Sequence, residues 1–260
     1  MRELVNWTLE KGVATLVLNN PPMNVVTLQL TRELGECLAE LAADPAVRVV
    51  VVTGAGTRAF CAGSDIKEFL ELMDPTVAID RKMAKENRVF DSLDRLPKPT
   101  IAAINGLALG GGAELALCCD LRVMAEGTRI GFPECKLGVF PGTGGTQRLP
   151  RLVGEALAKE LMYTGDPIDA QRAHQIGLVN RVVPAGQALA AARELAATIA
   201  ERSGLAVACI KEAVDYGLTA GEAAGQSLAL QLIGRLFGSE DVKEGVKAFL
   251  EKRPPKFQHR

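Results

Sequence analysis

The hydrophobic pattern begins with short apolar runs and then changes to a helical period. Residues 5–22, "VNWTLEKGVATLVLNNPP", are typical of two short strands joined by a turn at Lys11 and Gly12. The next segment, residues 27–45, has the spacing of an amphipathic helix that ends before a proline. Its predicted buried face carries four leucines: Leu30, Leu34, Leu38 and Leu41.

Buried strands and helices alternate through the middle of the chain. Residues 47–56, "VRVVVVTGAG", form a continuous β-branched run that predicts a strand buried on both faces. After Pro97 and Pro99 the pattern predicts a second buried strand, and then a helix that begins near Gly111. Residues 118–134 favour further strands.

From about Gly154 the pattern is mainly helical, with breaks at residues 165–170 and 182–186. The strand–helix–strand order predicts an α/β fold. We divide the chain into an α/β core over residues 1–200 and a helical part over residues 201–260.

The last segment, residues 221–257, predicts two helices with residues 239–241 between them. The first of these helices is more apolar than a solvated tail, at Leu228, Leu230, Leu232, Ile233, Leu236 and Phe237. These side chains either pack on the protein's own core or form contacts between subunits.

Composition narrows the class of protein. The chain has 260 residues, 48% of them hydrophobic, and a formal net charge of −1, so no global field attracts nucleic acid or an anionic membrane. No apolar run reaches the roughly 18–20 residues of a membrane-spanning helix, and the N-terminus lacks the apolar core of a secretory signal. We expect a soluble cytoplasmic protein.

Cysteine and histidine spacing argues against a metal site. The six cysteines form no CxxC pair and the two histidines lie far apart, which excludes the usual zinc and disulfide patterns. We interpret the cysteines as small buried hydrophobic residues in a reducing compartment. His174 lies where a helix is expected to end and is interpreted as structural.

The segment "LALGGGAELALCCD", residues 107–120, places three glycines and one acid between a strand and a helix. The first amides of a helix have no intrahelical acceptor, and glycine allows a ligand to approach the backbone. The amide of Gly111 is therefore a candidate donor to an oxygen that gains charge, with Glu114 beside it in the first helical turn. The alternative is a tight strand-to-helix corner with an acid that satisfies the helix dipole.

Two further segments favour a catalytic site over a purely structural corner. Residues 57–69, "TRAFCAGSDIKEF", place Ser64 between a strand and a helix and so supply a second backbone amide. Two amides from two loops are what an oxyanion hole requires. Residues 130–154, "IGFPECKLGVFPGTGGTQRLPRLVG", supply Glu134, and two carboxylates beside a polarised carbonyl suit acid–base chemistry.

The glycines that follow the first buried strand resemble part of a dinucleotide-binding turn. Gly54 and Gly56 lack a third glycine at the required spacing and a clear acidic partner for a ribose. This pattern does not predict a Rossmann site.

Together, these segments resemble the enoyl-CoA hydratase/isomerase family, the crotonase superfamily. The segments that carry the resemblance span nearly the whole chain: "NNPPMNVVT", "VRVVVVTGAGTRAFCAGSDIKEF", "LPKPTIAAINGLALGGGAELALCCDLRVM", "IGFPECKLGVFPGTGGTQRLPRLVG" and "DAQRAHQIGLVNRVVP". The resemblance implies a spiral of repeated ββα units with a helical C-terminal part, assembled as a homotrimer or homohexamer. It also implies a coenzyme A thioester substrate and no separate cofactor, because coenzyme A enters as part of the substrate.

The resemblance also implies roles for individual residues. The amides of Ser64 and Gly111 would form the oxyanion hole, Glu114 would activate water, and Glu134 would supply the proton to Cα. The substrate and its coenzyme A would contact Met23, Ala62, Ser64, Asp65, Ile66, Lys67 and Gly111. The early segment around Met23 is shorter than in family hydratases and lacks a lysine common there.

The implied activity is a hydro-lyase reaction, the reversible addition of water across the 2,3 double bond of a trans-2-enoyl-CoA, as in the β-oxidation of fatty acids. Two alternatives within the family are an enoyl-CoA isomerase and a dehydratase of a decorated acyl-CoA of the carnitinyl or methylglutaconyl type. A third alternative is a non-catalytic or RNA-binding member, although the chain has no basic stretch with interleaved aromatic residues.

Overall fold

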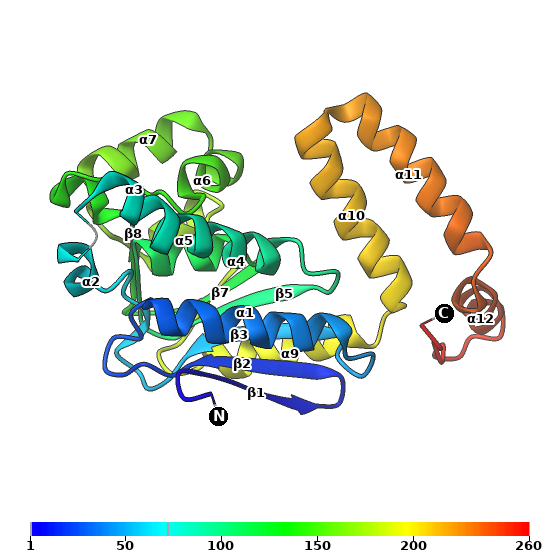
Figure 1. Ribbon diagram of the computed structural model, residues 1–260. Helices are drawn as coiled ribbons and strands as arrows, with labels where there is room; N and C mark the ends of the chain where they lie inside the picture. The colour runs from blue at the N-terminus through cyan, green and yellow to red at the C-terminus, as the bar shows by residue number, and fades with distance from the viewer. Residues whose placement is uncertain (1, 72, 260) are drawn as a thin grey trace.

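The computed structural model describes residues 2–71 and 73–259, which form two sheets surrounded by helices (Figure 1). The six-stranded sheet has the order β1 (Val5–Glu10), β2 (Val13–Leu18), β3 (Val49–Gly54), β5 (Thr100–Ile104), β7 (Leu121–Ala125), β10 (Arg181–Val183). The four-stranded sheet has the order β4 (Ala59–Cys61), β6 (Leu107–Leu109), β8 (Arg129–Gly131), β9 (Ile168–Asp169). Only the β1–β2 hairpin and the β8–β9 pair are antiparallel among these strands.

The chain alternates between the two sheets in a spiral. β3, β5 and β7 are parallel neighbours in the six-stranded sheet, and each is followed by a strand of the four-stranded sheet: β4, β6 and β8. Helices follow the second strand of each pair, which makes three successive ββα units. The expected spiral of ββα units is therefore confirmed.

The helices within and around these units are α1 (Leu28–Ala43), α2 (Ile66–Leu70), α3 (Pro75–Ala78), the π-helix η1 (Ile79–Met83), α4 (Ala84–Asp94), α5 (Gly111–Leu117), the 3₁₀-helix η2 (Pro133–Leu137), α6 (Gly145–Val153), α7 (Glu155–Thr164), α8 (Ala170–Gln175) and α9 (Ala188–Ala200). After α9 the chain continues through α10 (Gly204–Ala220), α11 (Glu222–Phe237) and α12 (Glu240–Leu250).

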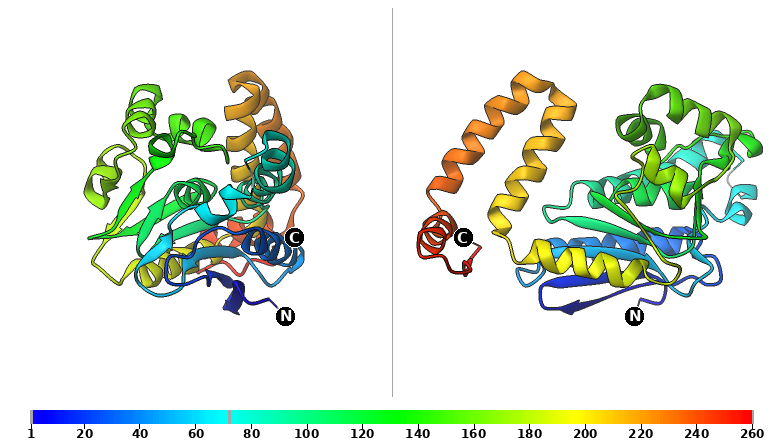
Figure 2. Two further views of the ribbon diagram at one scale, coloured as in Figure 1. Left: turned by 60° about the vertical axis from the view of Figure 1, so that its left-hand side comes forward. Right: turned by 180° about the vertical axis from the view of Figure 1, so that it is seen from behind.

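The six-stranded sheet is covered on both faces. Val50 and Val52 of β3 pack on the side of α1, whereas Val49 and Val51 pack on the opposite side against α9. Figure 2 shows α9 along that second face in the view from behind. All residues of β3 are buried, as its β-branched run predicts, and the four leucines predicted for the buried face of α1 are buried as well.

The last three helices project away from the sheets (Figures 1 and 2). α10 and α11 pack against each other as an antiparallel pair, and Ser239 begins α12 with a side-chain cap on the amide of Val242. Leu230, Ile233 and Phe237 are 74%, 51% and 71% exposed, so they do not pack on the protein's own core. Leu232, by contrast, is buried.

Two sequence-based expectations need correction. Residues 145–153 form the helix α6, whereas the pattern predicts mainly helical structure only from about Gly154. β9 and β10 lie at or beside the two breaks expected in that part, at residues 165–170 and 182–186. Cys135 is exposed, as it lies in η2, which has no buried residue, whereas the other five cysteines are buried as expected. In the part of the chain that the structure covers, no helix is long and apolar enough to cross a membrane.

Candidate active site

The three glycines between β6 and α5 meet three different requirements. Gly110 has a φ of 53°, which favours glycine, and a Cβ there would lie 3.1 Å from Glu134 Oε1. A Cβ on Gly112 would lie 1.9 Å from the Cys61 carbonyl oxygen, so α5 packs against β4 only with glycine at this position. A Cβ on Gly111 would meet nothing closer than Ser64 Oγ at 3.5 Å. A Cβ on Gly111 would therefore make only ordinary contacts, all with the Ser64 loop.

The backbone nitrogen of Ser64 lies close to Gly111. Ser64 forms a parallel bridge with Val26, in which Val26 donates to the Gly63 carbonyl at 2.8 Å and accepts from the Asp65 amide at 3.0 Å. This bridge uses the groups on either side of Ser64 and leaves the Ser64 amide without an acceptor among the described residues. A Cβ on Gly111 would lie 3.6 Å from the Ser64 nitrogen, and a Cβ on Gly63 would lie 3.6 Å from the Gly111 nitrogen. The amide nitrogens of Ser64 and Gly111 therefore lie close together.

Glu114 lies in the first turn of α5 and is buried. Its Oε1 accepts hydrogen bonds from the amides of Thr143 and Gly145, both at 2.8 Å, and no hydrogen bond reaches Oε2 from the described residues. Burial raises the pKa of Glu114 to about 7, and the nearby charge of Glu134 acts in the same direction. This carboxyl group can therefore exchange a proton near neutral pH.

Glu134 follows Pro133 in the first turn of η2. Both of its carboxylate oxygens are buried, and neither accepts a hydrogen bond from the described part of the chain. Burial raises the pKa of Glu134, which favours its protonated form. Because Glu134 lies beside Gly110 and interacts electrostatically with Glu114, the structure brings both predicted acids to the same corner.

The remaining predicted contact residues border the Ser64 loop. The Met23 carbonyl accepts a hydrogen bond of 3.0 Å from the Ala62 amide, which fixes the early segment against this loop. Asp65 caps α2 by accepting from the Lys67 amide at 3.0 Å, and the side chains of Ile66 and Lys67 are exposed. All of the predicted contact residues therefore lie on one stretch of surface around Ser64.

Sequence reasoning missed the residues that hold Glu114 in place. Thr143 and Gly145 supply the two amide donors, and a Cβ on Gly145 would lie 2.9 Å from Glu114 Oε1. Arg148 binds the same loop through the Thr143 carbonyl at 3.2 Å and forms an ion pair with Asp91 at 2.6 Å. The glycine pair at 144–145 was the available signal, because adjacent glycines mark a close approach of the backbone.

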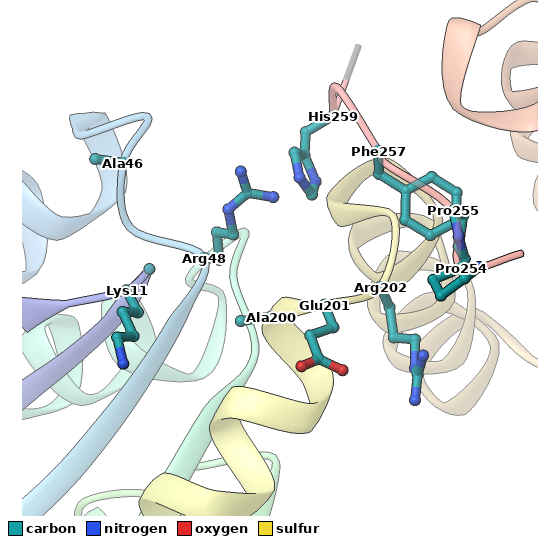
Figure 3. Close-up of a pocket in the computed structure, with 11 residues that line it drawn as sticks. Lys11, Ala46, Arg48, Ala200, Glu201, Arg202, Pro254, Pro255, Phe257 and His259 are labelled. Atoms are coloured by element: carbon teal, nitrogen blue, oxygen red, sulfur yellow. The ribbon is translucent and has the colours of Figure 1, made fainter. Parts of the chain in front are cut away.

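A separate crevice lies far from these residues. Its volume is about 810 Å³, and it separates the loop at Arg48 from the C-terminal segment at His259 (Figure 3). Neither predicted acid lines it. Among the described residues, no group of three or more histidine, cysteine, aspartate or glutamate side chains has the arrangement of a metal site.

Comparison with known proteins places this geometry in a family. The family model for enoyl-CoA hydratase/isomerase matches residues 8–260. A crotonyl-CoA hydratase of Syntrophomonas wolfei is 41% identical over 249 residues, which cover 95% of each protein. A short-chain-enoyl-CoA hydratase of Clostridium acetobutylicum is 40% identical over 254 residues, which cover 96% of this chain and 97% of that protein.

The fold agrees with the sequence relationship. The crystal structure of an enoyl-CoA hydratase from Bacillus anthracis superposes with a TM-score of 0.95 at 39% identity, and the match covers 99% of this chain and 100% of that chain. The family model, the sequence relatives and the similar crystal structure thus all match this chain over almost its whole length. The chain belongs to the enoyl-CoA hydratase/isomerase family and has the crotonase-type spiral fold.

Proposed function

We propose that this protein is an enoyl-CoA hydratase that adds water reversibly across the 2,3 double bond of a trans-2-enoyl-CoA. The observation that carries the proposal is the pair of acids, Glu114 and Glu134, buried together at the corner where the amides of Ser64 and Gly111 have no acceptor among the described residues. Two carboxyl groups and two free amides are what the addition of water to a conjugated thioester requires.

The reaction begins with polarisation of the thioester. Its carbonyl oxygen accepts hydrogen bonds from the amides of Ser64 and Gly111, which draw electron density from the double bond and stabilise the enolate-like transition state. Removal of one such donor typically costs about 10²–10³ in kcat. Both donors are backbone groups held by their neighbours, so they need no reorganisation as charge develops.

The two acids then move protons at opposite ends of the double bond. Glu114, ionised, takes a proton from water as the hydroxyl group bonds to Cβ, and Glu134, protonated, gives its proton to Cα. This requires one proton on the pair of acids. Their mutual repulsion and their burial favour that state, since a second negative charge in the same buried corner is costly.

Coenzyme A is bound, in this proposal, as part of the substrate along Met23, Ala62 and the start of α2. Asp65, Ile66 and Lys67 lie there, and the exposed ammonium group of Lys67 has no ion-pair partner among the described residues. Such a cation suits the phosphate groups of coenzyme A. The pantetheine arm would then lead to Ser64 and Gly111.

The proposed assembly is a homotrimer or a dimer of trimers that forms through the projecting helices. Residues of α10 and α11 carry the exposed apolar surface, including Ile210, Val214, Leu218, Leu230, Ile233 and Phe237. Several large apolar side chains left exposed on two packed helices favour a contact surface. We also propose a cytoplasmic location, since all six cysteines are free thiols, as is usual in a reducing compartment.

An activity screen tests the proposed reaction. Purified protein is mixed with crotonyl-CoA and with trans-2-enoyl-CoAs of increasing length and branching, and loss of the conjugated thioester absorbance is followed. We expect rapid loss with formation of the 3-hydroxyacyl-CoA. Conversion of a 3-enoyl-CoA without hydration of any 2-enoyl-CoA would instead assign an isomerase.

A further inference from the structure

A buried charged cluster lies next to the loop that carries Ser64. Lys82 of η1 and Glu86 of α4 are buried, and the side chain of Glu68 on α2 is 24% exposed. Lys82 Nζ lies 2.8 Å from Glu68 Oε2 and 2.7 Å from Glu86 Oε1. Burying three charged groups together is costly unless their geometry serves a purpose, and none of them takes part in the proton transfers above.

The ammonium group of Lys82 reaches the bridge that frames Ser64. Nζ donates a hydrogen bond of 3.3 Å to the Val26 carbonyl, which also accepts from the Asp65 amide at 3.0 Å. Val26 in turn donates to the Gly63 carbonyl at 2.8 Å. Both neighbours of Ser64 are thus bonded to one residue, and Lys82 holds that residue.

Glu68 provides a second connection from Lys82 to the same segment. Its Oε2 accepts from Lys82, and its Oε1 accepts from the amide of Leu28 at 3.1 Å, at the first residue of α1. Glu68 belongs to α2, which begins two residues after Ser64. Lys82 therefore reaches the Ser64 segment by two routes, one through Val26 and one through Glu68 of α2.

We propose that Lys82 is a positioning residue for the oxyanion hole: its buried ammonium group fixes Val26 and α2 so that the Ser64 amide adjoins the Gly111 amide. The proposal rests on the proposed function, which assigns the oxyanion hole. Misplacement of a reacting group by about 1 Å can cost about 100-fold in rate. A shift of the Ser64 amide would act on the transition state, in which the thioester oxygen carries the most charge.

Glu86 supplies the second counter-charge rather than a connection to the loop. Its contact with Lys82 is an ion pair at 2.7 Å. Burial raises the pKa of Glu86, and the charge of Lys82 opposes that change. Removing Lys82 alone would leave Glu86 buried without its cation, so loss of folding in that single variant would say little about Ser64.

The test therefore uses the paired variant Lys82→Met/Glu86→Gln, which removes both charges and keeps the side-chain lengths. Lys85→Met is the matched control, since Lys85 is exposed on α4, the helix that carries Glu86. We expect the paired variant to fold, with kcat for crotonyl-CoA lower by about 10- to 100-fold and KM changed by less than about threefold. A folded paired variant with the kcat of the control would overturn the proposal.

A spectroscopic measurement separates positioning from a general loss of stability. Bound crotonyl-CoA is observed by infrared spectroscopy in a Glu114→Gln background, where hydration is slow. Hydrogen bonds from the two amides lower the carbonyl stretching frequency of the thioester. We expect a smaller lowering when Lys82→Met/Glu86→Gln is added, and an unchanged frequency would contradict the proposed role of Lys82.

A measurement without substrate distinguishes failure of this proposal from failure of the proposed function. Amide hydrogen exchange across residues 62–70 should accelerate at least about tenfold in Lys82→Met/Glu86→Gln relative to the wild type and Lys85→Met, because the segment loses its anchors. Unchanged exchange would overturn the positioning role of Lys82. Wild-type protein that hydrates no enoyl-CoA would instead overturn the proposed function.

Discussion

The amide of Gly145 donates a hydrogen bond of 2.8 Å to Glu114 Oε1, although the two residues are 31 positions apart in the chain. The Thr143 amide reaches the same oxygen at the same distance. Two donors on one oxygen leave Oε2 as the free acceptor, so the loop before α6 fixes which oxygen of Glu114 can hold water. Arg148 anchors this loop to α4 through Asp91.

Glu114→Gln and Glu134→Gln should each fold normally and lose at least about 100-fold in hydration rate, as expected when an acid–base group is removed. A glutamine at position 114 keeps an oxygen for the amides of Thr143 and Gly145, so its structure should persist. Initial rates with crotonyl-CoA measure the loss, and Glu160→Gln on the exposed side of α7 is the control. Near wild-type turnover in either variant would remove that residue from the mechanism.

Glu114 should also make the protein less stable as pH rises. Its pKa is about 7 when folded against 4.5 ordinarily, so the folded protein binds a proton more tightly than the unfolded chain. The free energy of unfolding then falls between about pH 4.5 and pH 7, by up to about 3 kcal/mol. Urea unfolding at pH 5 and pH 8, at one protein concentration, should show a smaller fall in Glu114→Gln than in the wild type. An identical pH dependence in both proteins would show that Glu114 titrates normally.

The projecting helices should hold the assembly together. At micromolar concentration, sedimentation velocity should give the mass of a trimer or hexamer, because α11 exposes Leu230, Ile233 and Phe237. Ile233→Ser/Phe237→Ser should shift the protein toward the monomer, since burial of these side chains contributes about 1.5–3 kcal/mol each. Leu9→Ser, on the distant strand β1, should not. A wild-type monomer at this concentration would reject the proposed assembly.

The local pattern of hydrophobic, polar and glycine residues predicted most helices and strands. It also predicted those site residues that lie at a recognisable change from strand to helix. Short segments were enough to predict three features: the helix α1 from its leucines, the strand β3 from its β-branched run, and the strand-to-helix change at Gly111. Ser64, Gly111, Glu114 and Glu134 lie in such segments, so their sequence context pointed to one site. The structure brings these four residues together, while their chemical roles remain predictions.

Contacts between distant segments could not be predicted in the same way. The hydrogen bond from Gly145 to Glu114 and the reach of Lys82 to Val26 depend on how separate units pack. The helix α6 was missed because glycines precede it and Pro150 lies inside it, both of which usually interrupt helices. Cys135 was expected to be buried because its residue type usually is, but η2 leaves it exposed.

Substitution of alanine for Gly110, Gly111 or Gly112 should have a different effect at each position. Gly112→Ala should not fold, since its Cβ would lie 1.9 Å from the backbone of Cys61. Gly110→Ala should fold with reduced stability, because a φ of 53° strains alanine and the new methyl group would press on Glu134. Gly111→Ala should fold well, as its Cβ has ordinary contacts, yet it should lose activity because that Cβ occupies the space beside the Ser64 amide. Thermal unfolding and the rate of crotonyl-CoA hydration, measured on all three variants, test these three expected outcomes.

Comparison of Gly111→Pro with Gly111→Ala tests the amide itself, because both variants add a Cβ in the same place and only proline also removes the N–H. Proline is well tolerated at the first position of a helix, where its missing N–H has no intrahelical acceptor, and Gly110 before it can adopt the backbone angles that proline requires. We expect this variant to fold, to bind substrate with little change in KM, and to lose about 10²–10³ in kcat, since the amide acts mainly once charge develops on the thioester oxygen. A folded Gly111→Pro protein with ordinary turnover would show that the glycines form only a tight corner and that the Gly111 amide has no part in the reaction.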